Sequence, residues 1–233
     1  MRTDVASLLG LVLKEYNEMQ FFLRLLKMSV LNDTLLIDAI RSGDLNFEPE
    51  LSIKRIQPAS VDMTLDATVE EIPQGIRVDF ASKEKLTRKE VVIGDDGYVL
   101  KPGQIVVGFT AEKMSLSKQI TGRVYNRNSL VSWGLDVSAS NYVNPGYSGK
   151  MPLCIRNTSN NEIVLRKGMR ICQMVYIRVG TETIRNYHER HDIDAFGDVF
   201  EKNEPNFLFG HVDELDETYS KILSDTIKKA VSR

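Results

Sequence analysis

Two short motifs in the second half of the chain carry residue types that bind a phosphate chain and a flat ring. The first is the turn formed by Arg127, Asn128 and Ser129. It places a permanent cation, amide and hydroxyl donors and backbone N–H groups on one turn, a combination that holds phosphate oxygens. The second is the Asn-Pro-Gly-Tyr-Ser-Gly hairpin at residues 144–149, where Tyr147 offers an aromatic face to a base or sugar. Together they predict a site for a deoxynucleoside triphosphate.

The cysteines and histidines are too few to form a disulfide framework or a zinc site. The two cysteines, Cys154 and Cys172, indicate a reducing compartment. A free cysteine in a strand is usually buried and inert, and we expect this of Cys154. His188 and His191 have helical metal spacing, but the third histidine, His211, is distant in the sequence. We therefore expect no zinc, which needs three or four protein ligands.

The composition is that of an ordinary soluble protein. The chain has 233 residues and a formal net charge of -2, and it carries no basic run of the kind that binds nucleic acid. Residues 1–28 are apolar at helical spacing, but charged residues such as Lys14, Glu15 and Arg24 make them too polar to span a bilayer. We therefore expect that the protein binds neither nucleic acids nor membranes. Because no secretory pattern is present, we also expect it to be cytoplasmic.

These motifs must be positioned mainly by β-strands. One short helix is predicted first, from an N-cap at Asn32 or Asp33 to a stop at Gly43. Runs of alternating apolar residues follow, broken by turn sequences, at residues 53–72, 98–114, 118–130, 150–159 and 162–179. The last run places four residues on one strand face, namely Ile171, Gln173, Val175 and Ile177. So many short strands predict a mainly β fold, a barrel or jelly roll.

The chain is predicted to be one main domain with helical ends. Residues 1–28 read as a helical N-terminal extension, and residues 29–187 as the β domain. Residues 188–233 begin as a polar and aromatic arm or lid and end with apolar residues at helical spacing, which predicts a C-terminal helix. No internal repeat or low-complexity linker indicates a second main domain.

Several motifs occur in the order found in the dCTP deaminase and dUTPase superfamily, and the chain resembles the deaminase branch more closely. The motifs are residues 57–62, residues 100–103, residues 127–130 with Gly134 and Leu135, residues 145–149, and Gly168 with Gln173. Several short motifs in one order are far more specific than any one of them. The resemblance implies a dUTPase-like β-barrel and a homotrimer with nucleotide sites between subunits. It also implies Mg2+ that arrives with the bound triphosphate.

The resemblance assigns nucleotide-binding positions to residues that match the family's motifs. They are Arg127, Asn128 and Ser129 in the phosphate turn, Asn144 and Tyr147 in the hairpin, Gln173 in the last strand, and Tyr187 near the lid. In the family the aromatic residue at the position of Tyr147 lies beside the deoxyribose.

The residues that perform the chemistry in the family are replaced here. The deaminases' water-activating glutamate corresponds to Cys154. A thiol titrates too high and accepts hydrogen bonds too weakly to serve as that general base at neutral pH. The deaminases' arginine shortly after the phosphate turn corresponds to Ser132, and the dUTPases' water-activating carboxylate corresponds to Asn144. Neither family mechanism fits unchanged.

A surviving enzyme would need another base, and the candidates are Asp62, Asp136 and Glu162. Each also has a purely structural explanation. Asp62 would brace the turn at Ser60, Asp136 would be a solvated strand residue, and Glu162 lies beside the Asn-Asn turn. Three hypotheses remain open. In the first, the chain deaminates dCTP to dUTP and ammonia. In the second, it hydrolyses a deoxynucleoside triphosphate to monophosphate and pyrophosphate, as dUTPases do with Mg2+ held by the triphosphate. In the third, it is a catalytically inactive homotrimer that binds nucleotides or a protein partner.

Overall fold

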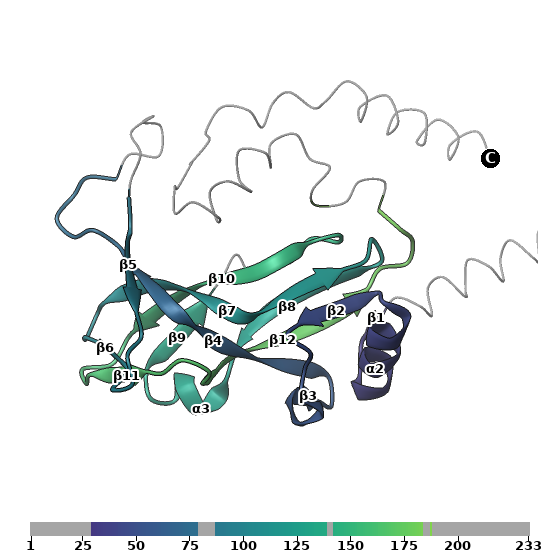
Figure 1. Ribbon diagram of the computed structural model, residues 1–233, viewed down its shortest axis with the longest axis horizontal. Coiled ribbons are helices and arrows are strands. Elements are labelled where there is room, and N and C mark those ends of the chain that lie inside the picture. Colours follow the sequence, from purple (N-terminus) through teal and green to yellow (C-terminus); the bar gives the residue numbers. More distant parts are fainter. Residues whose placement is uncertain (1–28, 79–86, 139–141, 184–186, 188–233) are drawn as a thin grey trace, which may run out of the picture.

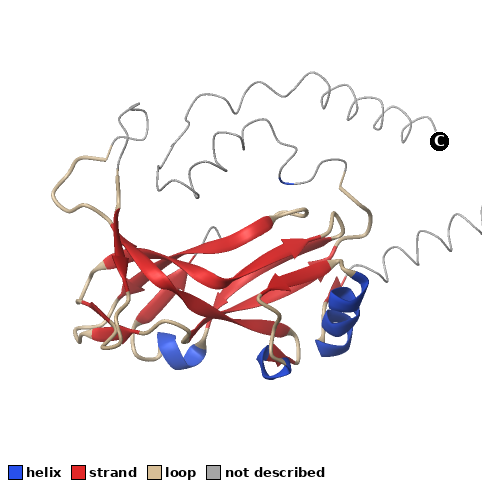
Figure 2. Cartoon of the chain, viewed as in Figure 1, coloured by secondary structure: helices blue, strands red, loops and turns tan. Residues whose placement is uncertain are grey.

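The computed structural model describes residues 29–78, 87–138, 142–183 and 187. The described chain forms a strongly twisted sheet that curls on itself (Figure 1). Its main path runs through β1 (Ser29–Val30), β12 (Arg170–Arg178), β4 (Ser60–Glu71), β7 (Ile105–Leu116), β10 (Ser148–Asn157) and β9 (Leu135–Ser138). Strands are the main regular structure of the described chain, and its helices are short (Figure 2). The predicted mainly β fold is confirmed.

Shorter strands extend this path at its sides. They are β2 (Leu45–Glu48), which pairs with β7; β3 (Ile56–Gln57) and β5 (Lys89–Val92), which pair with β4; and β8 (Ile120–Asn126), which pairs with β12. A separate small sheet joins β6 (Tyr98–Leu100) to β11 (Ile163–Leu165). The long strand β4 pairs with β12 near its beginning and with β5 and β7 toward its end. Because β4 changes partners along its length, one sheet can curl around one core.

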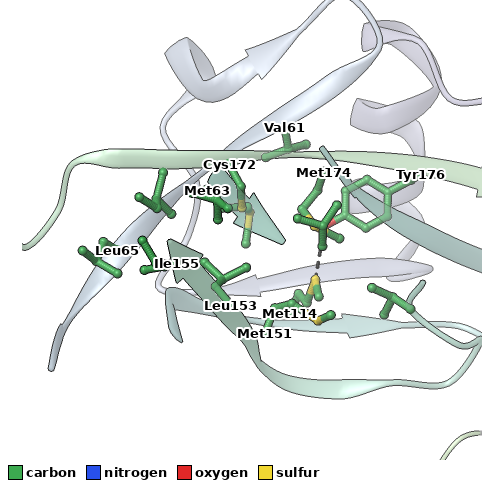
Figure 3. Close-up of a cluster of buried hydrophobic side chains, with 14 of the residues drawn as sticks. Val61, Met63, Leu65, Met114, Met151, Leu153, Ile155, Cys172, Met174 and Tyr176 are labelled. Atoms are coloured by element: carbon green, nitrogen blue, oxygen red, sulfur yellow. Dashed lines mark hydrogen bonds between the residues drawn. The ribbon is translucent and has the colours of Figure 1, made fainter. Parts of the chain in front are cut away.

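The core lies inside this curl, and Figure 3 shows the part of it that comes from β4, β7, β10 and β12. Alternate residues of each strand point inward, and they include Val61, Met63, Leu65, Met114, Met151, Leu153, Ile155, Cys172, Met174 and Tyr176. The hydroxyl of the fully buried Tyr176 donates to the Met114 sulfur at 3.3 Å. Each large apolar side chain buried in this way contributes roughly 1.5–3 kcal/mol.

The predicted first helix is confirmed as α2 (Asp33–Ser42). The side chain of Asn32 accepts a hydrogen bond from the Leu35 N–H at 2.9 Å, which is the expected N-cap contact. The helix ends at Gly43, whose left-handed φ of 79° suits a glycine. Two shorter helical turns follow, η1 (Ile53–Arg55) and α3 (Asn128–Val131).

The predicted face of the last strand is correct for three residues and wrong for one. Gln173, Val175 and Ile177 are half-buried and alternate with the core residues of β12. Ile171 is fully buried. The pairing of β12 with β4 shifts register between Arg170 and Cys172, and such a bulge adds one residue and interrupts the alternation.

The parts of the chain predicted to flank the β domain lie outside the described residues. These are the helical extension at residues 1–28 and the arm and helix at residues 188–233. Within the described chain, no helix is both long enough and apolar enough to cross a membrane.

Candidate functional site

The predicted phosphate turn is a single helical turn at the end of β8. The N–H groups of Leu130 and Val131 both donate to the Arg127 carbonyl, at 2.9 and 3.1 Å, so the turn closes on this residue. Arg127 itself has an extended backbone, and its side chain does not cap the turn. The guanidinium is therefore available for contacts with the neighbouring strands.

A buried carboxylate on β4 holds the Arg127 side chain. Asp62, whose side chain is 2% exposed, lies with Oδ1 3.5 Å from Arg127 Nε and with Oδ2 3.1 Å from Arg170 Nη1. Gln173 Nε2 donates to Asp62 Oδ1 at 3.3 Å. The structure thus brings together Arg127 and Gln173, which the sequence assigned to nucleotide binding. It adds Arg170, which the sequence motifs did not single out.

A second buried carboxylate connects this cluster to the core. Glu112 on β7 accepts hydrogen bonds from the backbone N–H and the hydroxyl of Thr64, and it pairs with Arg55 Nη1 at 2.6 Å. Arg55 Nε donates to the carbonyl of Asp62 at 2.8 Å. Burial acts to raise the pKa of Glu112, but the hydrogen bonds from Arg55 and Thr64 outweigh it and hold the pKa below its ordinary value. Glu112 is therefore ionised at neutral pH.

The hairpin residues form a second group. The N–H of Tyr147 donates to the Asn144 carbonyl at 3.2 Å, and the Tyr147 hydroxyl donates to the Lys150 carbonyl at 2.7 Å. The Tyr187 ring meets Tyr147 edge-on, with centroids 5.2 Å apart, and its N–H donates to the Pro145 carbonyl at 3.0 Å. Burial, and then the neighbouring Tyr187, raise the pKa of Tyr147 well above its ordinary value. The Tyr147 hydroxyl is therefore a neutral donor.

Cys154 lies near the middle of β10, opposite Ser138 of β9. Its neighbours Leu153 and Ile155 are fully buried, whereas Cys154 is half-buried, so its side chain lies on the outer face of the strand. The expectation of a buried Cys154 is wrong because the strand alternation places it away from the core. Cys172 is the buried cysteine, and burial raises the pKa of its thiol to about 12. Within the described chain, Cys154 makes no hydrogen bond or ion pair.

The three candidate replacement bases have different surroundings. Asp62 is occupied by two guanidiniums and an amide. Asp136 Oδ1 accepts from Asn126 Nδ2 at 2.7 Å, and Asn126 in turn accepts from the Val137 N–H at 2.7 Å, so Asp136 braces the end of β8 against β9. Glu162 is exposed beside its turn.

The described residues also contain no group of three His, Cys, Asp or Glu side chains placed to hold a metal ion. His188, His191 and His211 lie outside the described residues. Ser132, which the resemblance predicted to replace the deaminases' arginine, is exposed, and its hydroxyl donates to the Ser129 carbonyl at 3.4 Å.

Comparison with known proteins identifies the family. The model of the dCTP deaminase-like family matches residues 30–179. The chain belongs to this family. The dCTP deaminase, dUMP-forming, of Coprothermobacter proteolyticus is 38% identical over 152 residues, which cover 63% of this chain and 81% of that protein. The protein of the same name from Persephonella marina is 31% identical over 152 residues, which cover 64% of this chain and 84% of the relative.

A solved structure shares the fold of this dCTP deaminase-like chain. The crystal structure of 2'-deoxycytidine 5'-triphosphate deaminase from Agrobacterium tumefaciens aligns with a TM-score of 0.53 and 19% sequence identity. The alignment covers 76% of this chain and 54% of that protein. The likeness supports the fold alone, because the identity is low and about half of the larger protein is matched.

Proposed function

We propose that this dCTP deaminase-like chain binds a pyrimidine deoxynucleoside triphosphate and does not deaminate it by the route that the family motifs imply. The cluster around Asp62 carries the proposal. Three arginines, Arg55, Arg127 and Arg170, face two carboxylates, Asp62 and Glu112. Three positive and two negative charges leave one positive charge in excess. The Arg127 and Arg170 side chains are 25% and 42% exposed, so this charge lies where phosphate oxygens can reach it.

The pyrimidine and the sugar are proposed from the family and from the hairpin. The relatives are named as dCTP deaminases, and Tyr147 and Asn144 are held together in one turn. The Asp62 carboxylate already contacts two guanidiniums and is therefore not free to bind Mg2+. We propose that Mg2+ arrives bound to the phosphates.

A second candidate function is catalytic, and the relatives favour it. Their name describes formation of dUMP from dCTP, which joins deamination to the loss of pyrophosphate. Both steps need a group that activates water. Cys154 and Asn144 stand where the family motifs place such carboxylates, and neither side chain can act as that base. This function therefore requires a base from elsewhere in the protein or its assembly.

We propose a homotrimer in the cytoplasm as the working form. The phosphate cluster and the hairpin group are held by separate contacts within one chain. In a trimer, the arginine cluster around Asp62 of one subunit and the hairpin of a neighbouring subunit could bind the same nucleotide. Light scattering should then give three times the 26.4 kDa mass of one chain, and a monomer would contradict this assembly.

Replacement of Arg127 tests the nucleotide site. Arg127→Ala removes a charge-assisted contact to phosphate, so calorimetric titration with dCTP and Mg2+ should show binding weakened by about 1.5–3 kcal/mol. Arg123→Ala is the matched control, because Arg123 is an exposed arginine of β8 whose guanidinium lies 5.7 Å from the Tyr125 ring centroid. It should bind dCTP as the parent does. Unchanged affinity in Arg127→Ala would remove the nucleotide-site assignment.

A further inference from the structure

We propose that Arg170 is a second phosphate-binding arginine of this site, and that Asp62 is the residue that positions it beside Arg127. The inference rests on the proposed nucleotide binding and deepens it, since it names a cation and an anchoring carboxylate that the phosphate turn itself does not contain.

The contacts of Asp62 divide between its two oxygens. Oδ2 faces Arg170 Nη1 at 3.1 Å, while Oδ1 faces Arg127 Nε at 3.5 Å and Gln173 Nε2 at 3.3 Å. Arg127 Nη1 also donates to the Arg170 carbonyl at 3.3 Å. One carboxylate thus holds the two guanidiniums as neighbours and leaves part of each unused.

The unused donors are suited to a polyphosphate. A guanidinium has five N–H donors. Within the described chain, Nη2 of Arg127 and both Nε and Nη2 of Arg170 make no hydrogen bond. Both side chains are partly exposed, at 25% and 42%. Paired guanidiniums with free donors bind phosphate oxygens in the forked geometry that arginine favours.

Burial of Asp62 explains how two like charges can be kept together. A carboxylate that is 2% exposed needs full pairing, since an unpaired buried charge is costly. Two guanidiniums repel each other when the charge between them is removed. The carboxylate therefore prepares the anion site before ligand arrives, which reduces the ordering cost of binding.

Three neighbouring strands fix this geometry. Gln173 of β12 stands directly opposite Asp62 of β4 and opposite Tyr125 of β8. Arg127 follows directly after β8, and Arg170 stands at the bulge that begins β12. The register of three strands, and not the phosphate turn alone, therefore determines where the two guanidiniums lie.

Titration with inorganic tripolyphosphate and with dCTP, both with Mg2+, tests the role of Arg170 in the full-length chain. Arg170→Gln should weaken binding of both ligands roughly 10- to 100-fold, as expected for loss of a charge-assisted bond. Arg178→Gln is the matched control, because Arg178 also lies on β12 and pairs with a carboxylate, Asp44, at 3.1 Å. It should leave both affinities within about twofold of the parent. Equal affinities in Arg170→Gln and the parent would overturn the inference.

The role of Asp62 is tested by the direction of change in Asp62→Asn. If the carboxylate contributed only its charge, removing it would tighten anion binding. A positioning carboxylate predicts the opposite, a loss of affinity for tripolyphosphate with the fold intact by circular dichroism. Tighter binding would overturn this role. If Asp62→Asn does not fold, a cycle of Arg127→Gln, Arg170→Gln and the double variant decides. If both arginines bind the same polyphosphate, the loss of affinity in the double variant should differ from the product of the losses in the two single variants. A double-variant loss equal to that product would overturn the inference.

The two ligands separate this inference from the proposed function. Tripolyphosphate binding that depends on Arg170, without binding of any deoxynucleotide, would support the two-arginine site and contradict the nucleotide function. Binding of dCTP that depends on Arg127 and is indifferent to Arg170 would support the function and contradict the inference.

Discussion

Position 154 carries a thiol on the outer face of a strand, where the family motifs place a water-activating carboxylate. The strand alternation leaves Cys154 half-buried on the outer face while it buries Leu153 and Ile155. A glutamate at this position would be ionised at neutral pH and could accept a proton from water. A thiol cannot serve as that general base. By the same resemblance, Ser132 is predicted to replace a cation close to the phosphate turn. These two substitutions are the residue-level reason for proposing binding without the family's catalysis.

Restoring both side chains tests this explanation. Cys154→Glu combined with Ser132→Arg should raise dCTP deamination, by roughly a hundredfold or more if the new carboxylate acts as general base. The assay is release of ammonia and dUTP from dCTP. Cys154→Gln with Ser132→Arg is the control, because the amide has the same shape and cannot accept the proton. No gain over that control would contradict the correspondence of Cys154 with the catalytic position.

Some of the residues that we propose to bind the nucleotide stand out in the sequence, but the carboxylate that contacts them does not. Arg127 and Gln173 stand out because they belong to local motifs. Asp62 was one of three candidate bases, and only the pairing of β4, β8 and β12 shows that it holds two arginines. Arg170 carries no local signal, since its role depends on a carboxylate far away in sequence.

At the scale of elements, one glycine joins the phosphate turn to the next strand. Gly134 has a left-handed φ of 84°, its N–H donates to the Val131 carbonyl at 2.9 Å, and its carbonyl accepts from the Thr158 N–H at 2.7 Å. A Cβ at this position would lie 2.6 Å from the Ser159 Cβ and 2.9 Å from its backbone nitrogen. The end of α3 therefore fits against the β10–β11 turn only without a side chain.

Gly134→Ala should therefore cost more stability than backbone strain alone. Gly103 provides the control, because its φ is 73° and no atom lies within 4 Å of an added Cβ. Gly103→Ala should lower the free energy of unfolding by roughly 1–2 kcal/mol from backbone strain. Gly134→Ala should lower it further, by about 1–3 kcal/mol, because the backbone at Ser159 must move. Equal losses in urea denaturation would contradict this close packing.

Local patterns predicted the elements better than their pairing. The cap at Asn32, the stop at Gly43 and each alternating apolar run are local signals, and α2 and the strands form where these signals stand. The bulge near Ile171 was missed because it arises from the register of β12 against β4. That register is a relation between strands distant in the chain, and periodicity within one strand does not contain it.

At the scale of the whole molecule, a buried carboxylate on β7 holds η1 against the neighbouring strands β4 and β7. Glu112 on β7 bonds to Thr64 on β4 and to Arg55 in η1. The Glu112 side chain is 3% exposed and that of Arg55 is 16% exposed. Removing one partner of such a pair leaves the other charge buried without compensation, which typically costs about 3–5 kcal/mol.

The pH dependence of stability should report this pair. The pKa of Glu112 in the folded chain lies below its ordinary value of 4.5. A lowered folded pKa gives stability that is complete above the unfolded pKa and is lost as pH falls through the folded pKa. The free energy of unfolding should therefore fall as pH drops below about 4.5. In Glu112→Gln it should be lower at neutral pH and fall less steeply in acid.

An exposed ion pair controls for the loss of charge alone. Lys150 and Asp66 lie 2.6 Å apart with side chains 45% and 25% exposed, so Asp66→Asn should change stability by no more than about 1 kcal/mol. Denaturation series in urea across pH compare the three proteins. The same acid dependence in Glu112→Gln and in the parent would contradict a stabilising role for the Glu112 carboxylate.

The most direct test of the account is incubation of the purified protein with each of the deoxynucleoside triphosphates and Mg2+. Thermal shift reports binding, and chromatography reports products. We predict stabilisation by a pyrimidine deoxynucleoside triphosphate without conversion of dCTP to dUTP or dUMP. Release of ammonia, or of pyrophosphate with a monophosphate, would show that a base outside the family's positions is active. The absence of stabilisation by every deoxynucleotide would contradict the central claim that this chain binds them.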